Sequence, residues 1–194
     1  MSDTALLKVL GYIWGAFGIY WIVVARGGTP AQTSESPIYR LVRLAILCIT
    51  FTLLFSERTA TGILGRRFVP HFPAIAYSGF FLTLAGLAIA LWARIHLGQY
   101  WSDKVVLRAD HQLIQSGPYA YMRHPIYSGV LLGIGGTALL VGEWRGALAF
   151  ALLLTNYAIK AKKEERVLSA QFGDQFREHL QRAGFLLPRL RRCR

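Results

Sequence analysis

One short segment concentrates side chains that can do chemistry. It reads Gly117-Pro-Tyr-Ala-Tyr-Met-Arg-His-Pro-Ile-Tyr-Ser-Gly129 and leads directly into an apolar run. Ionisable groups are costly near a bilayer, so their presence there indicates a functional site. Pro125 suits the first turn of a helix, which places His124 near the N-cap, where free amide donors favour an anionic group. Arg123 can hold a carboxylate through two hydrogen bonds. The alternative is ordinary anchoring by Arg, His and Tyr at a membrane interface.

A second group of charged residues follows, from Lys162 to Leu168, with consecutive carboxylates at Glu164 and Glu165. Consecutive residues differ by about 100° around a helix, so we expect only one of the two to reach a site. The other can pair with a lysine, and Lys160 lies four residues before Glu164, a spacing that permits a surface pair. The alternative is a solvated charged helix face.

Composition places this chemistry in a membrane protein. Of the 194 residues, 54% are hydrophobic and only 16% are charged, below the quarter that is usual for soluble domains. The net charge of +12 accompanies long uncharged apolar runs, which favours the cytoplasmic side of a membrane protein over a nucleic-acid binder. The two cysteines are far apart and predict no disulfide framework. The five histidines are scattered and no metal-ligand motif occurs, so no metal site is expected.

The apolar runs predict an all-α integral membrane protein with about five transmembrane helices, a C-terminal helical hairpin and a cytosolic helical tail. The expected spans are 9–25, 41–55, 72–92, 126–141 and 147–159. The last two are short and lie close together, which predicts a tight hairpin. Gly129, Gly133 and Gly136 have helical spacing and favour close helix packing. We interpret residues 1–194 as one domain, in which 1–70 supply two spans and 72–194 the core.

The placement of Lys and Arg predicts the orientation. With five spans and a cytoplasmic C-terminus, most of the 22 basic residues fall on the cytoplasmic side. The residues on the outer side are Lys8, Arg58, Arg66, Arg67 and Arg145. Three of these lie in one loop and count against the assignment. We therefore expect a multi-pass protein whose site faces the cytoplasm.

Together these segments resemble a known family. The pattern from His111 to Gly129, followed by Glu164-Glu165, Leu168, Phe172-Gly173 and Pro188-Arg189, is similar to the isoprenylcysteine carboxyl methyltransferase family of integral membrane enzymes. That family is related to the phospholipid N-methyltransferases, and the resemblance covers roughly residues 80–190.

The resemblance implies methyl transfer that depends on S-adenosylmethionine, with Arg123 and Glu165 as catalytic candidates. The implied cofactor-binding residues are His111, Leu113, Tyr119, His124, Pro125, Tyr127, Glu164 and Glu165. Members of the family often carry tyrosines where this chain has Phe176 and His179, which puts the hydrogen bonding of the tail in question.

A carboxylate is ionised at neutral pH and needs no general base, whereas an amine must first lose a proton. No catalytic dyad is evident, which suits O-methylation or S-methylation better than hydrolysis. Together with the family resemblance, this leads us to expect O-methylation of the carboxylate of a lipidic or prenylated acceptor at the membrane. Two alternatives stay open at this point: a phospholipid-amine N-methyltransferase, and a membrane binding module of the same fold without catalysis. The sequence leaves the acceptor, the route of substrate entry and the oligomeric state open.

Overall fold

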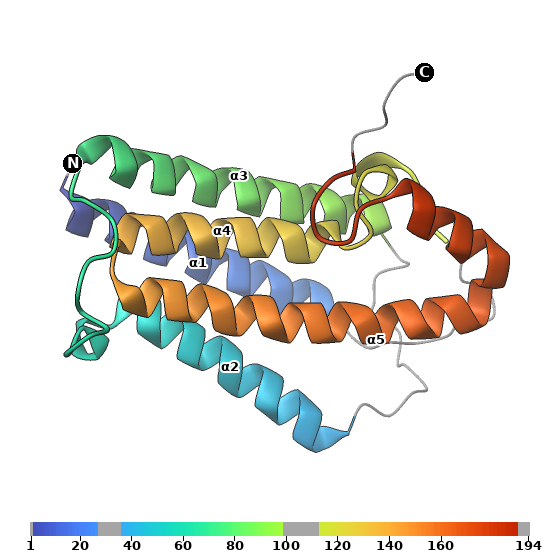
Figure 1. Cartoon of the computed structure of the whole chain (residues 1–194), viewed down its shortest axis with the longest axis horizontal. Helices are drawn as coiled ribbons and strands as arrows, with labels where there is room; N and C mark the ends of the chain where they lie inside the picture. The colour runs from blue at the N-terminus through green and yellow to red at the C-terminus, as the bar shows by residue number, and fades with distance from the viewer. Residues whose placement is uncertain (1, 27–35, 99–112, 190–194) are drawn as a thin grey trace.

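A computed structural model describes residues 2–26, 36–98 and 113–189, with only the backbone described at 25 and 26. These ranges are helical apart from connecting turns and two isolated β-bridges, as the predicted all-α class requires. The helices are α1 (Asp3–Arg26), α2 (Pro37–Phe55), α3 (Pro73–Leu97), α4 (Pro125–Val141) and α5 (Trp144–Arg182), with short 3-10 turns η1 (Glu57–Thr59) and η3 (Gly117–Ala120). They run lengthwise side by side in a bundle, and α5 extends beyond the others at one end (Figure 1).

Three of the helices are long and apolar enough to cross a membrane: α1, α2 and α3, with mean hydropathies of 1.6, 1.9 and 2.0. The chain is therefore an integral membrane protein. The helix α4 has 17 residues, about 26 Å, slightly shorter than a hydrocarbon core of about 30 Å. The count of five spans remains a prediction.

Two helices begin four or more residues before the predicted spans. The first starts at Asp3 because Ser2 caps it: the backbone amide of Ala5 donates to Ser2 Oγ at 3.3 Å. An acidic residue in the first turn also favours the helix dipole. The second starts at Pro37, which fits the first turn of a helix without losing a hydrogen bond.

The predicted hairpin between α4 and α5 is present, and Gly142 ends α4 with φ +67°. Residues 64–69 cover the turn: the backbone amide of Phe68 donates to the Gly142 carbonyl at 3.0 Å. Arg67 Nη1 donates to the carbonyl of Val141 at 3.3 Å. The buried Arg145 donates to the Leu53 and Ser56 carbonyls at the end of α2, at 3.1 and 2.8 Å. Arginines at this end of the bundle thus supply donors to helix carbonyls.

Close packing of α3 on α4 depends on small residues, which confirms the packing role expected for the α4 glycines. A Cβ added at Gly136 would lie 2.6 Å from the Gly79 carbonyl oxygen and from the Thr83 backbone nitrogen. A buried polar network crosses the same interface: Trp14 Nε1 donates to Thr137 Oγ1 at 3.1 Å, and the Thr83 and Thr137 hydroxyls are 3.2 Å apart. Helices α1, α3 and α4 are joined by these contacts.

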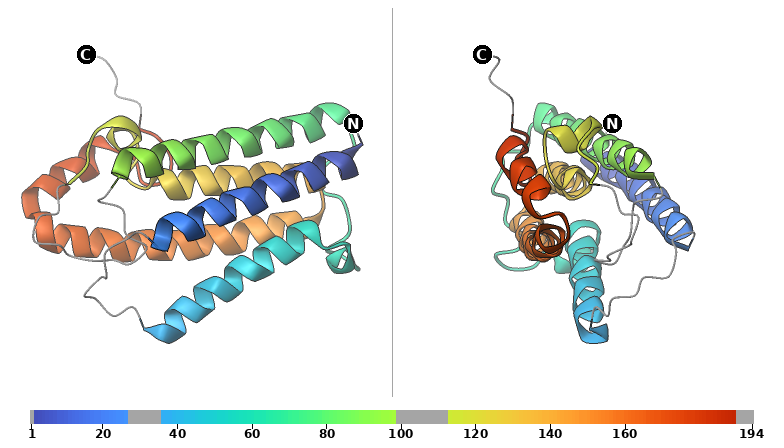
Figure 2. Two further views of the ribbon diagram at one scale, coloured as in Figure 1. Left: turned by 180° about the vertical axis from the view of Figure 1, so that it is seen from behind. Right: turned by 90° about the vertical axis from the view of Figure 1, so that its right-hand side faces the viewer.

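The expected fifth span 147–159 is the first part of α5, which continues without a break into the charged segment, as predicted. Gly173 interrupts the helix with φ 49° and ψ −118°, a conformation that L side chains rarely adopt. Beyond it the chain turns back toward the bundle, and the last part of α5 lies near η3 and the start of α4 (Figures 1 and 2). This reversal builds the site at that end of the molecule.

The tight α3–α4 contact yields a stability prediction. We expect Gly136→Ala to lower the free energy of unfolding by about 1–3 kcal/mol, because the methyl group would force the two backbones apart. Thermal unfolding in detergent micelles measures the change. Gly18→Ala on α1 is the matched control, because nothing lies within 4 Å of its added Cβ. Equal shifts for the two variants would contradict the packing argument.

Candidate active site

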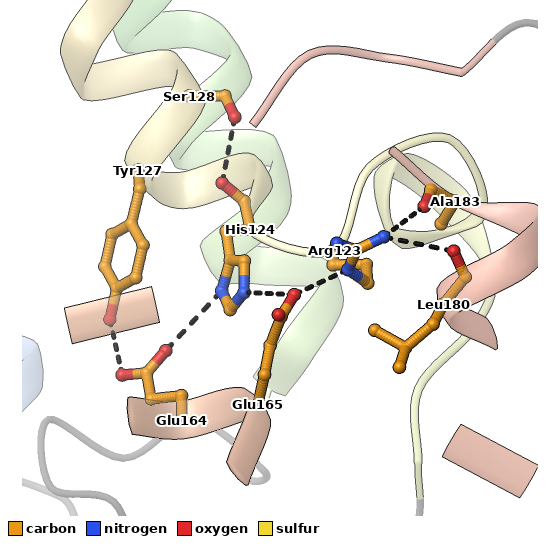
Figure 3. Close-up of polar contacts among 8 residues, drawn as sticks. All are labelled: Arg123, His124, Tyr127, Ser128, Glu164, Glu165, Leu180 and Ala183. Carbon is orange, nitrogen blue, oxygen red and sulfur yellow. Dashed lines mark hydrogen bonds and ion pairs between the residues drawn. The ribbon is translucent and has the colours of Figure 1, made fainter. Parts of the chain in front are cut away.

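A continuous chain of polar contacts joins the start of α4 to the middle of α5 (Figure 3). The Tyr127 hydroxyl donates to Glu164 Oε1 at 2.5 Å. The ring of His124 lies between the two glutamates, with Nδ1 3.5 Å from Glu164 Oε2 and Nε2 3.3 Å from Glu165 Oε1. Arg123 Nε donates to the same Glu165 oxygen at 2.6 Å. We call these five residues the polar cluster.

The expectation that only one glutamate reaches the site is therefore wrong. Glu164 and Glu165 point in directions about 100° apart on α5, but the His124 ring lies between them. One ring nitrogen faces Glu164 and the other faces Glu165. The expected pair of Lys160 with Glu164 is present, with Nζ 3.9 Å from Oε1. It is buried rather than on the surface, because Lys160 is 8% exposed. The face of α5 that carries Lys160, Glu164 and Glu165 is thus turned inward, while Lys162, Lys163 and Arg166 are exposed.

Residues 183–189, here called the C-terminal strap, cover the cluster. Arg123 Nη1 donates to the carbonyls of Leu180 and Ala183 at 3.2 and 2.5 Å. The Arg123 amide donates to the Gly184 carbonyl at 2.8 Å, and the Ser128 hydroxyl donates to the Leu186 carbonyl at 2.5 Å. The strap is therefore attached to both the motif segment and the first turn of α4.

Aromatic rings surround the histidine. Tyr127 stacks on His124 with centroids 5.5 Å apart and an interplanar angle of 9°. Phe185 of the strap meets the same imidazole edge-on at 5.5 Å. Tyr157 of α5 packs on Tyr127 at 4.8 Å. Such faces exclude water from the ion pairs and attract cations.

Electrostatics favour the charged form of every member of the His–Glu group. Burial opposes protonation of His124, but hydrogen bonds and negative charges from Glu164 and Glu165 outweigh burial and raise the pKa of His124. Burial likewise opposes ionisation of the glutamates. Hydrogen bonding to His124, followed by the charge of Lys160 for Glu164 and by Arg123 for Glu165, lowers the pKa of both carboxyls. The glutamates are thus weak bases.

The remaining predicted residues lie around the cluster. Pro125 is buried in the first turn of α4. Tyr119 is buried in η3 and donates to the Ala93 carbonyl at 3.5 Å; burial and then the charge of Glu164 raise the pKa of Tyr119. Leu113 is half-buried before η3. His111 lies outside the described residues.

The two positions that depart from the family pattern are Phe176 and His179. Both side chains are buried on the last part of α5, and their ring centroids are 6.2 Å apart. Burial and then the positive charge of Arg123 lower the pKa of His179. Its imidazole is therefore neutral beside Arg123 at physiological pH.

Four residues near the cluster were absent from the predicted site: Tyr157, Lys160, Ser128 and Phe185. Helical spacing could have identified Tyr157 and Lys160, which share a face of α5 with Glu164. Ser128 donates to the strap, and Phe185 belongs to the strap and contacts His124. No local sequence pattern predicts these long-range contacts.

The arrangement suits a ligand that carries both charges. The carboxylates and aromatic faces match a cation, while Arg123 and the free amides at the start of α4 match an anion. Within the described residues, no group of three His, Cys, Asp or Glu side chains is placed to hold a metal ion.

The raised pKa of His124 predicts how stability depends on pH. Protonated His124 stabilises the fold fully below its unfolded pKa of about 6.5, and this stabilisation is lost as pH rises through the higher folded value. Thermal unfolding of wild type should therefore show a decline above neutral pH that His124→Gln lacks. Parallel profiles for the two proteins would contradict the assignment.

Comparison with known proteins gives a consistent result. The model of the isoprenylcysteine carboxyl methyltransferase (ICMT) family matches residues 79–170, which contain the whole polar cluster. The chain is similar to protein-S-isoprenylcysteine O-methyltransferase of Schizosaccharomyces pombe, with 32% identity over 99 residues, which cover 50% of this chain and 42% of that protein. It is also similar to protein-S-isoprenylcysteine O-methyltransferase B of Arabidopsis thaliana, 32% identical over 117 residues that cover 59% of each chain.

The fold is similar to that of the eukaryotic intramembrane Ras methyltransferase ICMT, with a TM-score of 0.51 at 21% identity; the match covers 81% of this chain and 54% of that one. All three similarities span about half the length of the known proteins. The region 79–170, which holds the Arg-His-Pro-x-Tyr motif and helix α4 together with the paired glutamates of α5, is thus the part of the chain that is similar to the isoprenylcysteine carboxyl methyltransferase family.

Proposed function

We propose that this protein transfers a methyl group from S-adenosylmethionine to the carboxylate of a lipophilic acceptor at the cytoplasmic face of the membrane. One observation carries the proposal. A buried cluster of two carboxylates, an imidazole and a guanidinium lies at one end of an apolar helix bundle, within the region that defines the family. Such a cluster can bind a polar cofactor beside the lipid phase.

The residues present fit the cofactor. Its sulfonium and ammonium groups are cationic and match Glu164, Glu165 and the face of Tyr127. Its carboxylate matches the free amides that follow His124 and Pro125 at the start of α4. Family resemblance adds Tyr119, Leu113 and His111 to the proposed lining.

Bound S-adenosylmethionine supplies a methyl group on a positively charged sulfur; transfer to a carboxylate oxygen breaks the carbon–sulfur bond, leaves the electron pair on sulfur and produces a neutral ester without moving a proton. The chain's residues need to orient the two reactants and exclude water. We propose that Arg123 and Glu165 perform the orientation at the reacting end, since Arg123 pairs with Glu165 and also donates to the Ala183 carbonyl of the strap.

The state of the glutamates favours a carboxylate acceptor over an amine. An amine must lose a proton before it can attack, and Glu164 and Glu165 are the nearby carboxylates. Both are engaged with His124, and their lowered pKa makes them poor bases. The names of the S. pombe and Arabidopsis relatives, protein-S-isoprenylcysteine O-methyltransferases, support a prenylated carboxylate as the acceptor.

Arg67, one of the three loop arginines that count against the cytoplasmic orientation, donates to the Val141 carbonyl at the opposite end of the bundle. The outer Arg145 donates to the Leu53 and Ser56 carbonyls at the same end, so both arginines have a role in the fold. The remaining Lys and Arg asymmetry supports a site on the cytoplasmic side.

Calorimetric titration with S-adenosylhomocysteine tests cofactor binding. We expect wild type to bind and both Glu165→Gln and Glu164→Gln to bind more weakly, with the larger loss, about tenfold or more, for Glu165→Gln. That variant also removes the charged partner of Arg123, whereas Glu164→Gln leaves the Arg123–Glu165 pair intact. Glu178→Gln is the control, since its side chain is 64% exposed on the same helix. Equal, negligible effects at 164 and 165 would remove both glutamates from the site.

The acceptor is tested with radiolabelled S-adenosylmethionine in membranes supplemented with N-acetyl farnesylcysteine. We expect label that mild base releases as methanol, because methyl esters hydrolyse whereas methyl amines and thioethers do not. Base-stable label in phosphatidylethanolamine would instead identify an amine acceptor. Cofactor binding without any transferred label would indicate a binding module.

A further inference from the structure

We propose that Arg43 and Tyr39 of α2, with Lys163 of α5, form the site that binds the carboxylate of the acceptor. This proposal rests on the proposed function, and it adds a second, acceptor-specific part to a site so far built from α4 and α5. Nothing in the family motif includes α2, since the matched region begins at residue 79.

The position of Arg43 in α2 is unusual. Most of the first two turns of α2 are exposed, including Ile38, Leu41 and Val42 at 74, 68 and 49%. Tyr39 and Arg43 are half-buried, and they are four residues apart on the helix face that continues with buried Thr50 and Leu54. The packing face of an apolar helix thus carries a phenol and a guanidinium at the end that lies nearest the polar cluster. A charge within an apolar span indicates function.

The three side chains form one group of donors. Lys163 Nζ lies 3.4 Å from the centroid of the Tyr39 ring, and the Arg43 guanidinium carbon lies 5.8 Å from the same centroid. The Tyr39 hydroxyl is buried and has no hydrogen-bond partner among the residues that the structure describes. A buried hydroxyl without a partner is destabilising, so the position calls for an acceptor atom. A carboxylate oxygen between two cations would supply it.

This group adjoins the Tyr127 end of the polar cluster. Lys163, whose ammonium group lies over the Tyr39 ring, directly precedes Glu164 of the cluster, and α2 packs against α5. Arg123 lies at the opposite end of the contact chain (Figure 3). The cluster therefore has Arg123 and the strap on one side and the α2 cations on the other, so the two reactants would be held from different sides.

The charge of the group also accounts for product release. An anionic acceptor gains charge-assisted hydrogen bonds to Arg43 and Lys163. After methylation the ester is neutral and loses that attraction, while the alkyl chain keeps its contact with lipid along the exposed face of α2. The site would therefore distinguish the acid from its own ester.

Direct binding of N-acetyl farnesylcysteine and of its methyl ester, with S-adenosylhomocysteine present, tests the proposal without requiring turnover. We expect wild type to prefer the acid by about tenfold or more and Arg43→Ala to lose that preference, with Arg43→Lys restoring part of it and Tyr39→Phe weakening it. Arg40→Ala, an exposed arginine one turn earlier, should behave as wild type. S-adenosylhomocysteine should bind all variants equally.

In turnover assays, Arg43→Ala should raise KM for the acid far more than it lowers kcat. Equal weakening of acid, ester and S-adenosylhomocysteine in Arg43→Ala would show a structural role and overturn the proposal. Competition by nanodiscs of phosphatidylglycerol, but not phosphatidylcholine, would assign the cations to lipid headgroups and also overturn it. A wild type that binds the acid selectively yet transfers no methyl would refute the proposed function alone.

Discussion

The paired carboxylates on either edge of the His124 imidazole are the interaction on which the rest of the site depends. Each charge is largely removed from water, so each would be costly without the others. Arg123 extends the network to the last turn of α5, and Tyr127 extends it into α4. Removing one member therefore leaves an unpaired charge in an apolar surrounding, and the network responds as a unit rather than as separate contacts.

The apolar bundle serves to place this network. Backbone contact between α3 and α4 requires the glycines at both surfaces, and it fixes where α4 begins. The short turn at Gly142 then sends α5 back along α4, so that residues four turns or more into α5 arrive beside the start of α4. Arg145 ties α2 to the same hairpin at the far end. The apolar helices thus fix the position of a polar cluster that lies at one end of the bundle.

Hydropathy predicted the helices and their order, because apolar length is a local property of the sequence. The motif around Arg123 and His124 and the glutamates of α5 were predicted as well, since their residue types are rare at such positions. The convergence of both glutamates on His124 was not, because it depends on the ring lying between two side chains. The contacts of the strap and of the α2 cations were missed for a related reason. Residues 121–123 contact residues 184–189, and Tyr39 contacts Lys163. Both contacts join distant parts of the chain, so no periodic sequence pattern predicts them.

The reversal at Gly173 means that the same helix supplies the floor of the site and the connection to its cover. The strap is tethered a few turns from Glu164 and Glu165, so its return is intramolecular, with an effective concentration that dilution of the protein does not change. Displacing the cover requires breaking the Arg123 and Ser128 contacts to strap carbonyls, while the ion pairs beneath can remain. The interruption of α5 at Gly173 therefore separates the covering strap from the charged groups beneath it.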